Sequence, residues 1–198
     1  LVLLGVSAYI GQLNRGLIIT AMRDQVSWGL YISNFTFLVG MAAAAMMLVL
    51  PAYILHDVDF ARAVLMAEAV AVAALVMCLC FVVVDIGNPL GGWHLIPGIG
   101  YLNWPRSLLA WDVLVLNGYL VLNVVISRAT FRAERAGTPP PGWVKPLVYL
   151  SIPWAVSIHT VTAFLYAGLA ARPFWLTAIL APCFLASAFA AGPALLIL

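Results

Sequence analysis

Hydrophobic side chains dominate this 198-residue chain: they make up 65% of it, charged residues make up 8%, and the mean hydropathy is +1.09. Such a composition excludes a soluble globular domain of this size, so the sequence predicts an integral membrane protein. The apolar stretches are long and lack the alternation of barrel strands, which predicts an all-α, polytopic transmembrane helical bundle. The net charge of +2 gives no indication of a nucleic-acid partner, and we expect none.

Six apolar segments are predicted to form helices, at residues 1–14, 28–55, 61–86, 107–128, 145–168 and 173–198. The chain begins without methionine inside one apolar run and ends inside another, so we expect it to be part of a longer protein. We do not expect residues 1–10 to be a signal peptide, because they contain neither a basic stretch nor a small-residue cleavage site. We divide it into an N-terminal helix with an interfacial segment (1–27), a four-helix transmembrane bundle (28–168) and the first helix of a following bundle (173–198).

The second and third segments carry the first polar groups inside the membrane. The second opens with Trp28 and Tyr31 at headgroup depth and places Asn34 about six residues below Trp28. The third carries Glu68 and ends just after Asp85, where Gly, Asn and Pro follow. The next loop is rich in Gly, Pro and aromatic residues, and we expect it to fold back over the helix ends as a lid.

The fourth segment contains WDVLVLNGYLVLN, which places a carboxylate, a phenol and an amide within one apolar run. At 100° per residue, Tyr119 and Asn123 fall within about 20° of Asp112 on a helical wheel. These three side chains are therefore predicted to form one polar stripe, and such stripes in membrane helices face protein or water.

The hydrophilic loop 129–145 and the residue before it concentrate Arg128, Arg132, Arg135 and Lys145. The positive-inside rule therefore predicts that this loop is cytoplasmic in a multi-pass protein of the cytoplasmic (inner) membrane. The margin is narrow, because alternation of the helices puts five of the nine basic residues on this side and four on the other.

The fifth segment carries His159, with Thr162 and Tyr166 on the same helix face. Because the predicted helices alternate in direction, a rise of about 1.5 Å per residue puts polar side chains from four helices into the same half of the membrane. These side chains are Asn34, Asp85, Asp112 and His159.

An amide, two carboxylates and an imidazole near one interface suit a quinone site, since the quinone oxygens need hydrogen-bond partners that exchange protons. His159 and Asp112 are predicted to be the catalytic pair, bonding the oxygens and accepting protons. Asn34 is predicted to orient the ring, and Tyr31 and Asp85 complete the predicted quinone-binding set.

Each of these residues also has a purely structural interpretation. Asp85 would be solvated at its helix end, and Asn34 would bond one helix to another. His159 would bond a neighbouring backbone carbonyl, and Asp112 would pair with Arg106, six residues earlier.

Deeper polar groups suggest a route for protons. Glu68 lies about seven residues from the basic side, and Tyr119 and Asn123 continue the stripe of the fourth segment inward. We predict that these three residues form a proton pathway. The alternative for Glu68 is a buried neutral carboxyl group bonded to a Ser or Thr.

The sequence favours no resident metal cofactor. Cys78, Cys80 and Cys183 lie in apolar runs. Because Cys78 and Cys80 are two residues apart, their side chains point about 200° away from each other on a helix and cannot bind one metal ion. His159 has no partner histidine at a matching depth, because His56 and His94 fall in connections. We expect no haem, no iron–sulfur cluster and no metal site in this chain.

Five stretches, taken together and in this order, indicate a protein family: WGLYISNFTFLVG, FVVVDIGNP, WD followed by NGYLVLN, PPPGWVKPL and IPWAVSIHTVTAFLYAG. The chain resembles the NrfD/PsrC family of quinone-interacting membrane subunits, and in particular its DsrP branch, the quinone-interacting membrane component of the sulfite-reduction-associated DsrMKJOP complex. The resemblance spans nearly all of this chain and about half of a family member.

The resemblance implies a membrane subunit of a respiratory complex without redox cofactors of its own. Such a subunit exchanges electrons between menaquinol or menaquinone and an extracytoplasmic, ferredoxin-like iron–sulfur subunit, here in sulfite and sulfur metabolism. Other DsrMKJOP-type subunits, including cytochromes, are implied partners. The subunit is not catalytic alone but belongs to a larger quinol oxidoreductase.

The resemblance also implies a quinone site near the outer face of a four-helix bundle formed by the second to fifth segments. The family's polar positions fall on Asn34, Asp112 and His159. The position after the third helix is often histidine in relatives of the alternative complex III type and is Asp85 here.

Two other functions are considered. A transporter or channel would bind its substrate at mid-membrane polar groups, commonly on helices interrupted by glycine. A structural anchor for redox subunits would not need Asp112 and His159 in the membrane.

Overall fold

The computed structural model describes residues 1–198 except 24, 27, 55–57, 97, 170–171 and 198. It is an all-α fold, which confirms the predicted fold class. The helices in chain order are α1 (Val2–Arg15), η1 (Leu17–Ile19), α2 (Leu30–Ile54), α3 (Val58–Asp85), η2 (Pro89–Leu95), α4 (Leu108–Arg135), α5 (Val144–Ala167), η3 (Pro173–Trp175) and α6 (Leu180–Ile197).

Three helices are long and apolar enough to cross a membrane: α3 over Ala63–Asp85, α4 over its full length and α5 over its full length. Shorter apolar helices cover Leu30–Ala43 in α2 and Leu180–Ala194 in α6. The predicted multi-pass membrane protein is therefore confirmed. Many large apolar side chains on these helices are exposed, as is expected of surfaces that face lipid rather than water.

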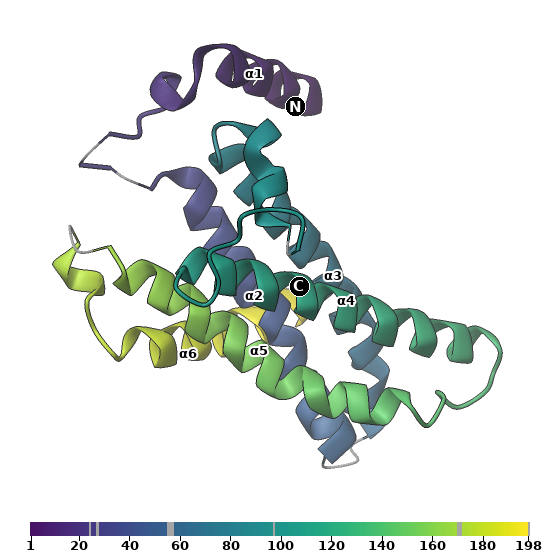
Figure 1. The fold of residues 1–198 in the computed structure, drawn as a ribbon. Helices are drawn as coiled ribbons and strands as arrows, with labels where there is room; N and C mark the ends of the chain where they lie inside the picture. The colour runs from purple at the N-terminus through teal and green to yellow at the C-terminus, as the bar shows by residue number, and fades with distance from the viewer. Residues whose placement is uncertain (24, 27, 55–57, 97, 170–171, 198) are drawn as a thin grey trace.

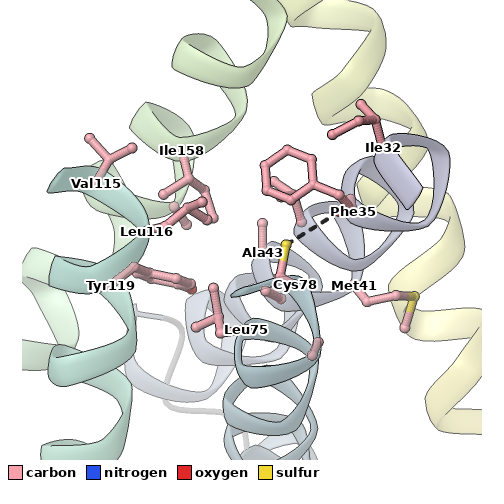
Figure 2. Packing of buried hydrophobic residues seen from close by; sticks show 14 of the residues in the cluster. Ile32, Phe35, Met41, Ala43, Leu75, Cys78, Val115, Leu116, Tyr119 and Ile158 are labelled. Carbon is pink, nitrogen blue, oxygen red and sulfur yellow. Dashed lines mark hydrogen bonds between the residues drawn. The ribbon is translucent and has the colours of Figure 1, made fainter. Parts of the chain in front are cut away.

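Helices α2 to α5 pack around two clusters of buried side chains, and α4 and α5 run side by side in opposite directions (Figure 1). The first cluster joins Phe35 of α2, Leu75 of α3, Tyr119 of α4 and Ile158 of α5 (Figure 2). Within it, the Cys78 thiol donates to the Phe35 carbonyl oxygen at 3.4 Å. The bundle interior at this level is thus mostly apolar.

The second cluster lies toward the loop between α4 and α5. It joins residues from the same four helices: Leu48, Val49, Val64, Ala67, Ala71, Leu122, Ile126, Val144 and Val148. The start of α3 and the end of α4 therefore lie at the same end of the bundle. The loop between α4 and α5 lies at this end as well.

Helix α4 is longer than predicted, because it continues past residue 128 to Arg135. The sequence there, RATFRAER, is rich in good helix formers, so the helix extends beyond the apolar run into the polar region. The Arg135 guanidinium lies over the Phe131 ring at 5.6 Å. The helix ends where Gly137 adopts a φ of 63°, and three prolines follow.

Helix α6 begins later than predicted, at Leu180 rather than at residue 173. Pro173 starts the short helix η3 instead, and the Thr177 hydroxyl accepts a hydrogen bond from the Ile179 N–H at 3.3 Å. Pro182 lies in the first turn of α6, where no backbone partner is lost. Helix α6 packs against α2 and α5; whether it starts a following bundle stays a prediction.

Candidate functional site

A cavity of about 310 Å³ lies between α2, α5 and α6, and the 3₁₀ helix η3 also contributes to its wall. Its volume is at the lower end of the range of about 300–1,000 Å³ for small-molecule sites. The lining combines a few polar side chains with aromatic and small ones. It consists of Ser33, Thr36, Phe37, Val39, Gly40, His159, Tyr166, Trp175, Phe184, Ser187, Ala188 and Ala191.

His159 of α5 is the ionisable group of the cavity wall best suited to proton transfer, and its side chain is only 2% exposed. Its Nδ1 lies 3.2 Å from the Ala155 carbonyl oxygen, one turn earlier. A carbonyl oxygen only accepts hydrogen bonds, so Nδ1 carries the proton and Nε2 of the neutral ring is an acceptor. The backbone bond considered from the sequence is present, and it orients the imidazole.

Asp112 of α4 is buried against α5, the helix that carries His159. The Thr162 hydroxyl of α5 donates to Asp112 Oδ1 at 3.2 Å, and both side chains are at most 2% exposed. Arg106 is exposed, so Thr162 rather than Arg106 is the partner of the carboxyl group. Thr162 follows His159 by three residues, so Asp112 contacts α5 near the face that carries His159, although Asp112 itself does not line the cavity.

A hydroxyl pair and a group of aromatic rings form the rest of the cavity wall. The hydroxyls of Tyr166 and Thr36 are 2.5 Å apart, linking α5 to α2. The Tyr166 ring lies edge-on to Trp175 at 4.9 Å and to Phe184 at 5.6 Å between centroids. Sequence reasoning placed Tyr166 on the face of His159 but did not select Thr36, Trp175 or the α6 side chains.

Tyr31 and Asn34 lie elsewhere on α2 and do not line this cavity. The Tyr31 hydroxyl donates to Gln12 Oε1 at 2.7 Å, and Gln12 Nε2 donates to the Val84 carbonyl oxygen at 2.8 Å. These bonds hold α1 across the ends of α2 and α3 (Figure 1). The Asn34 amide donates to the Leu30 carbonyl oxygen of its own helix at 2.9 Å rather than bridging to another helix.

Asp85 also lies outside the cavity lining. It is the last residue of α3 and half-buried, and its Oδ1 is buried without a hydrogen-bond partner among the described residues. The described residues of the loop 87–107, which we expected to form a lid, do not line the cavity either. Trp175 of η3 is the residue of a short connecting helix that does line the cavity.

A second polar group lies deeper, at the contact of α3 and α4. Glu68 is 2% exposed and faces Ser127, while the Asn123 amide donates to the Tyr119 carbonyl oxygen at 2.8 Å. Glu68 Oε2, Ser127 Oγ and Thr130 Oγ1 are buried without a partner among the described residues.

Ser127 and Thr130 extend the stripe that the sequence predicted on α4. From Tyr119 to Thr130 the spacing of four, four and three residues keeps all four polar side chains on one face, over about 16 Å of helix. The same period that identified Tyr119 and Asn123 therefore indicates Ser127 and Thr130, which sequence reasoning had not selected.

The cysteines do not form a cluster. Cys78 is buried, whereas Cys80 and Cys183 are exposed, and all three are free thiols. Within the described ranges of the chain, His, Cys, Asp and Glu side chains form no group of three that could hold a metal ion.

Comparison with known proteins gives a family match over residues 19–198, to the family described as polysulphide reductase, NrfD. Three relatives match nearly the whole chain. A protein of Halobacterium salinarum, provisionally named as a membrane subunit of dimethyl sulfoxide reductase, is 27% identical over 100% of this chain and 48% of its own length. A selenate reductase subunit of Mesobacillus selenatarsenatis is 27% identical over 97% of this chain and 52% of its own length.

The third relative is the Hdr-like menaquinol oxidoreductase integral membrane subunit of Archaeoglobus fulgidus, which is 22% identical over 98% of this chain and 46% of its own length. The chain thus spans about half the length of the curated relatives it matches. The family match covers all of the bundle α2–α5 together with α6 and the cavity between them. The chain therefore belongs to the polysulphide reductase (NrfD) family of membrane subunits.

Proposed function

We propose that this chain is the part of a respiratory membrane subunit that binds menaquinol or menaquinone and exchanges its electrons with a partner subunit. The observation that carries the proposal is the cavity wall at His159, with the buried Asp112–Thr162 pair beside it. An apolar and aromatic cavity with a few convergent polar groups is the usual form of a small-molecule site. One relative's name, menaquinol oxidoreductase, supports the choice of ligand.

The proposed reaction is oxidation of the hydroquinone to the quinone, which releases two electrons and two protons. Nε2 of His159 accepts a hydrogen bond from one hydroxyl and takes its proton as a general base. Asp112 accepts the second proton, and Thr162 holds its carboxyl group in place. The electrons pass to an iron–sulfur partner subunit, and the reverse steps reduce the quinone.

The remaining residues of the predicted set have supporting parts in this proposal. Tyr31 and Asn34 act at the outer ends of the helices, and Asp85 acts where α3 ends, as contacts of the quinone or of its entry path. None of the three lines the cavity, so we assign them a lesser share than His159. Asp112 does not line the cavity either, but its contact with Thr162, three residues along α5 from His159, gives it a larger share than theirs.

We further propose that protons leave along the α4 stripe, through Tyr119 and Asn123 to Glu68. Buried polar atoms are normally hydrogen-bonded, yet Glu68 Oε2 and Ser127 Oγ have no partner among the described residues. Bound water at these atoms would connect them, as buried waters commonly do between polar groups. This pathway ends toward the loop that we propose to be cytoplasmic.

The relatives' names describe membrane subunits of multi-subunit reductases and of a menaquinol oxidoreductase. We propose by analogy an extracytoplasmic ferredoxin-like iron–sulfur partner on the outer face. The finer assignment, to the DsrP branch in sulfite and sulfur metabolism with DsrMKJOP-type partners, rests on the motifs quoted above.

The test is quinol oxidation by the full-length subunit in its complex. General bases typically contribute about 10²–10⁴ in rate, so His159→Gln is expected to lower turnover of a menaquinol analogue by at least about 100-fold. Thr160→Val is the matched control, because Thr160 adjoins His159 but bonds only the Val156 carbonyl oxygen of its own helix.

Two outcomes would overturn the proposal. If His159→Gln and Asp112→Asn both turn over at the rate of Thr160→Val, the chain serves as an anchor for redox subunits. If the complex moves a solute across vesicles in a manner that needs these residues but not a quinol, the transporter interpretation takes its place.

A further inference from the structure

We propose that a second cavity, at the end of α4, binds the phosphate group of an anionic phospholipid. This cavity has a volume of about 430 Å³ and lies between the last turns of α4 and the loop that leads into α5. It is remote from the His159 cavity, with which it shares no lining residue. Its lining consists of Val125, Arg128, Ala129, Arg132, Ala133, Thr138, Pro139, Pro141 and Trp143.

The charge of this cavity is positive. Arg128 and Arg132 are four residues apart, so their guanidinium groups leave α4 on the same face. Among the residues that the structure describes, no acidic side chain lines the cavity, and Glu134 lies on another face of α4. The two guanidinium groups provide donors suited to phosphate oxygens, while the Thr138 hydroxyl donates to the Ala133 carbonyl oxygen at 3.4 Å.

The fold of the backbone between α4 and α5 shapes the space beside these donors. The Thr138 N–H donates to the Ala133 carbonyl oxygen at 3.0 Å, which folds the loop back onto the helix end. Three consecutive prolines follow, and each fixes its φ angle, so the loop is stiff. Ala129 and Ala133 supply small side chains between and beside the arginines, which leaves room for a ligand.

The position of the cavity favours a lipid over a soluble anion. It lies at the end of a membrane-spanning helix, where arginine side chains reach the headgroup level. Val125 is 38% exposed and Trp143 is 52% exposed, so an apolar surface adjoins the guanidinium groups. A phospholipid satisfies both parts, with its phosphate at the arginines and its acyl chains along the apolar surface of α4.

The experiment uses the full-length chain purified in detergent and mixed with equal amounts of phosphatidylglycerol and phosphatidylcholine. Native mass spectrometry counts each lipid that stays bound. The wild type is expected to retain phosphatidylglycerol preferentially. In the double variant Arg128→Gln, Arg132→Gln, the ratio of bound phosphatidylglycerol to bound phosphatidylcholine is expected to fall about tenfold. The control is Arg135→Gln, since Arg135 contacts Phe131 and does not line the cavity.

A parallel sample contains an excess of inorganic phosphate. This sample distinguishes a site for a lipid phosphate from a site for a soluble phosphate ion. Phosphatidylglycerol that remains bound supports a lipid site. Displacement by inorganic phosphate would show a site for a soluble anion and would overturn the proposal. Equal lipid retention by the double variant and the Arg135 control would also overturn it. Quinol oxidation is not measured, so this result is independent of the proposed function.

Discussion

At the scale of single residues, the contact between Asp112 and Thr162 decides how the candidate site is held. Replacing Thr162 with valine keeps the shape of the side chain but removes the donor to Asp112 Oδ1. Hydrogen bonds between membrane helices are worth about 0.6 kcal/mol on average and up to about 1.7. We expect Thr162→Val to lower the free energy of unfolding by about 1 kcal/mol, measured by denaturant titration of the purified protein.

The same substitution at Thr160 is the control, because that hydroxyl bonds only its own helix backbone. If the carboxyl group needs Thr162 for its position, Thr162→Val also slows quinol oxidation, whereas Thr160→Val does not. Equal stability and equal turnover of the two variants would show that the Asp112–Thr162 contact has no role.

At the level of single residues, the sequence predicts how deep a side chain lies in the membrane but not its direction around the helix axis. His159 and Asp112 could be selected because ionisable groups in apolar runs are rare, and depth counting brought them to one level. Depth does not say which way a side chain points around its helix. Tyr31 and Asn34 share that level, but Tyr31 bonds Gln12 and Asn34 bonds its own backbone.

At the scale of elements, the packing of α4 on α5 depends on one glycine. A Cβ atom at residue 118 would overlap the Trp154 ring, which is anchored by its indole N–H to the Val115 carbonyl oxygen at 2.9 Å. Overpacking of this kind costs about 1–3 kcal/mol. Gly118→Ala is therefore expected to lower the thermal unfolding midpoint of the detergent-solubilised protein, despite the better helix propensity of alanine.

Gly11→Ala, in α1, provides the comparison. A Cβ there meets nothing within 4 Å, so only the helix propensity changes and the midpoint should stay or rise. If Gly118→Ala is as stable as Gly11→Ala, α4 and α5 can separate without cost and the close packing at Trp154 is unimportant.

Element boundaries followed from the sequence where hydropathy and local propensity agree. The apolar run of α4 stops near residue 128, but its helix continues through Arg132 because helix formation needs no lipid. For α6 the apolar run begins before the helix does, since Pro173 and the Thr177 turn interrupt the backbone. Hydropathy thus marks what enters the membrane, whereas propensity and turn residues mark where the helices begin and end.

At the scale of the whole molecule, the two ends of the bundle have different chemistry. One end carries the His159 cavity and the η2 region, and the other carries the basic loop after α4. The polar stripe of α4 runs between them, from Asp112 to Thr130. The arrangement of α6 across the cavity could not be predicted, because the sequence of α6 has no charged residue and its contacts depend on tertiary packing.

This asymmetry predicts the orientation in the membrane. The loop 129–145 is expected to be cytoplasmic because basic residues are retained on that side. In a Cys80→Ser, Cys183→Ser background, Gly142→Cys should react with a membrane-impermeant maleimide only after cells are permeabilised. Asn103→Cys, in the loop before α4, should react in intact cells. Residues 142 and 103 are both exposed, so a difference in labelling reports the side of the membrane rather than burial of the thiol. The reverse pattern would place the His159 cavity nearer the cytoplasmic face, and the iron–sulfur partner that we propose would then have to be a cytoplasmic protein.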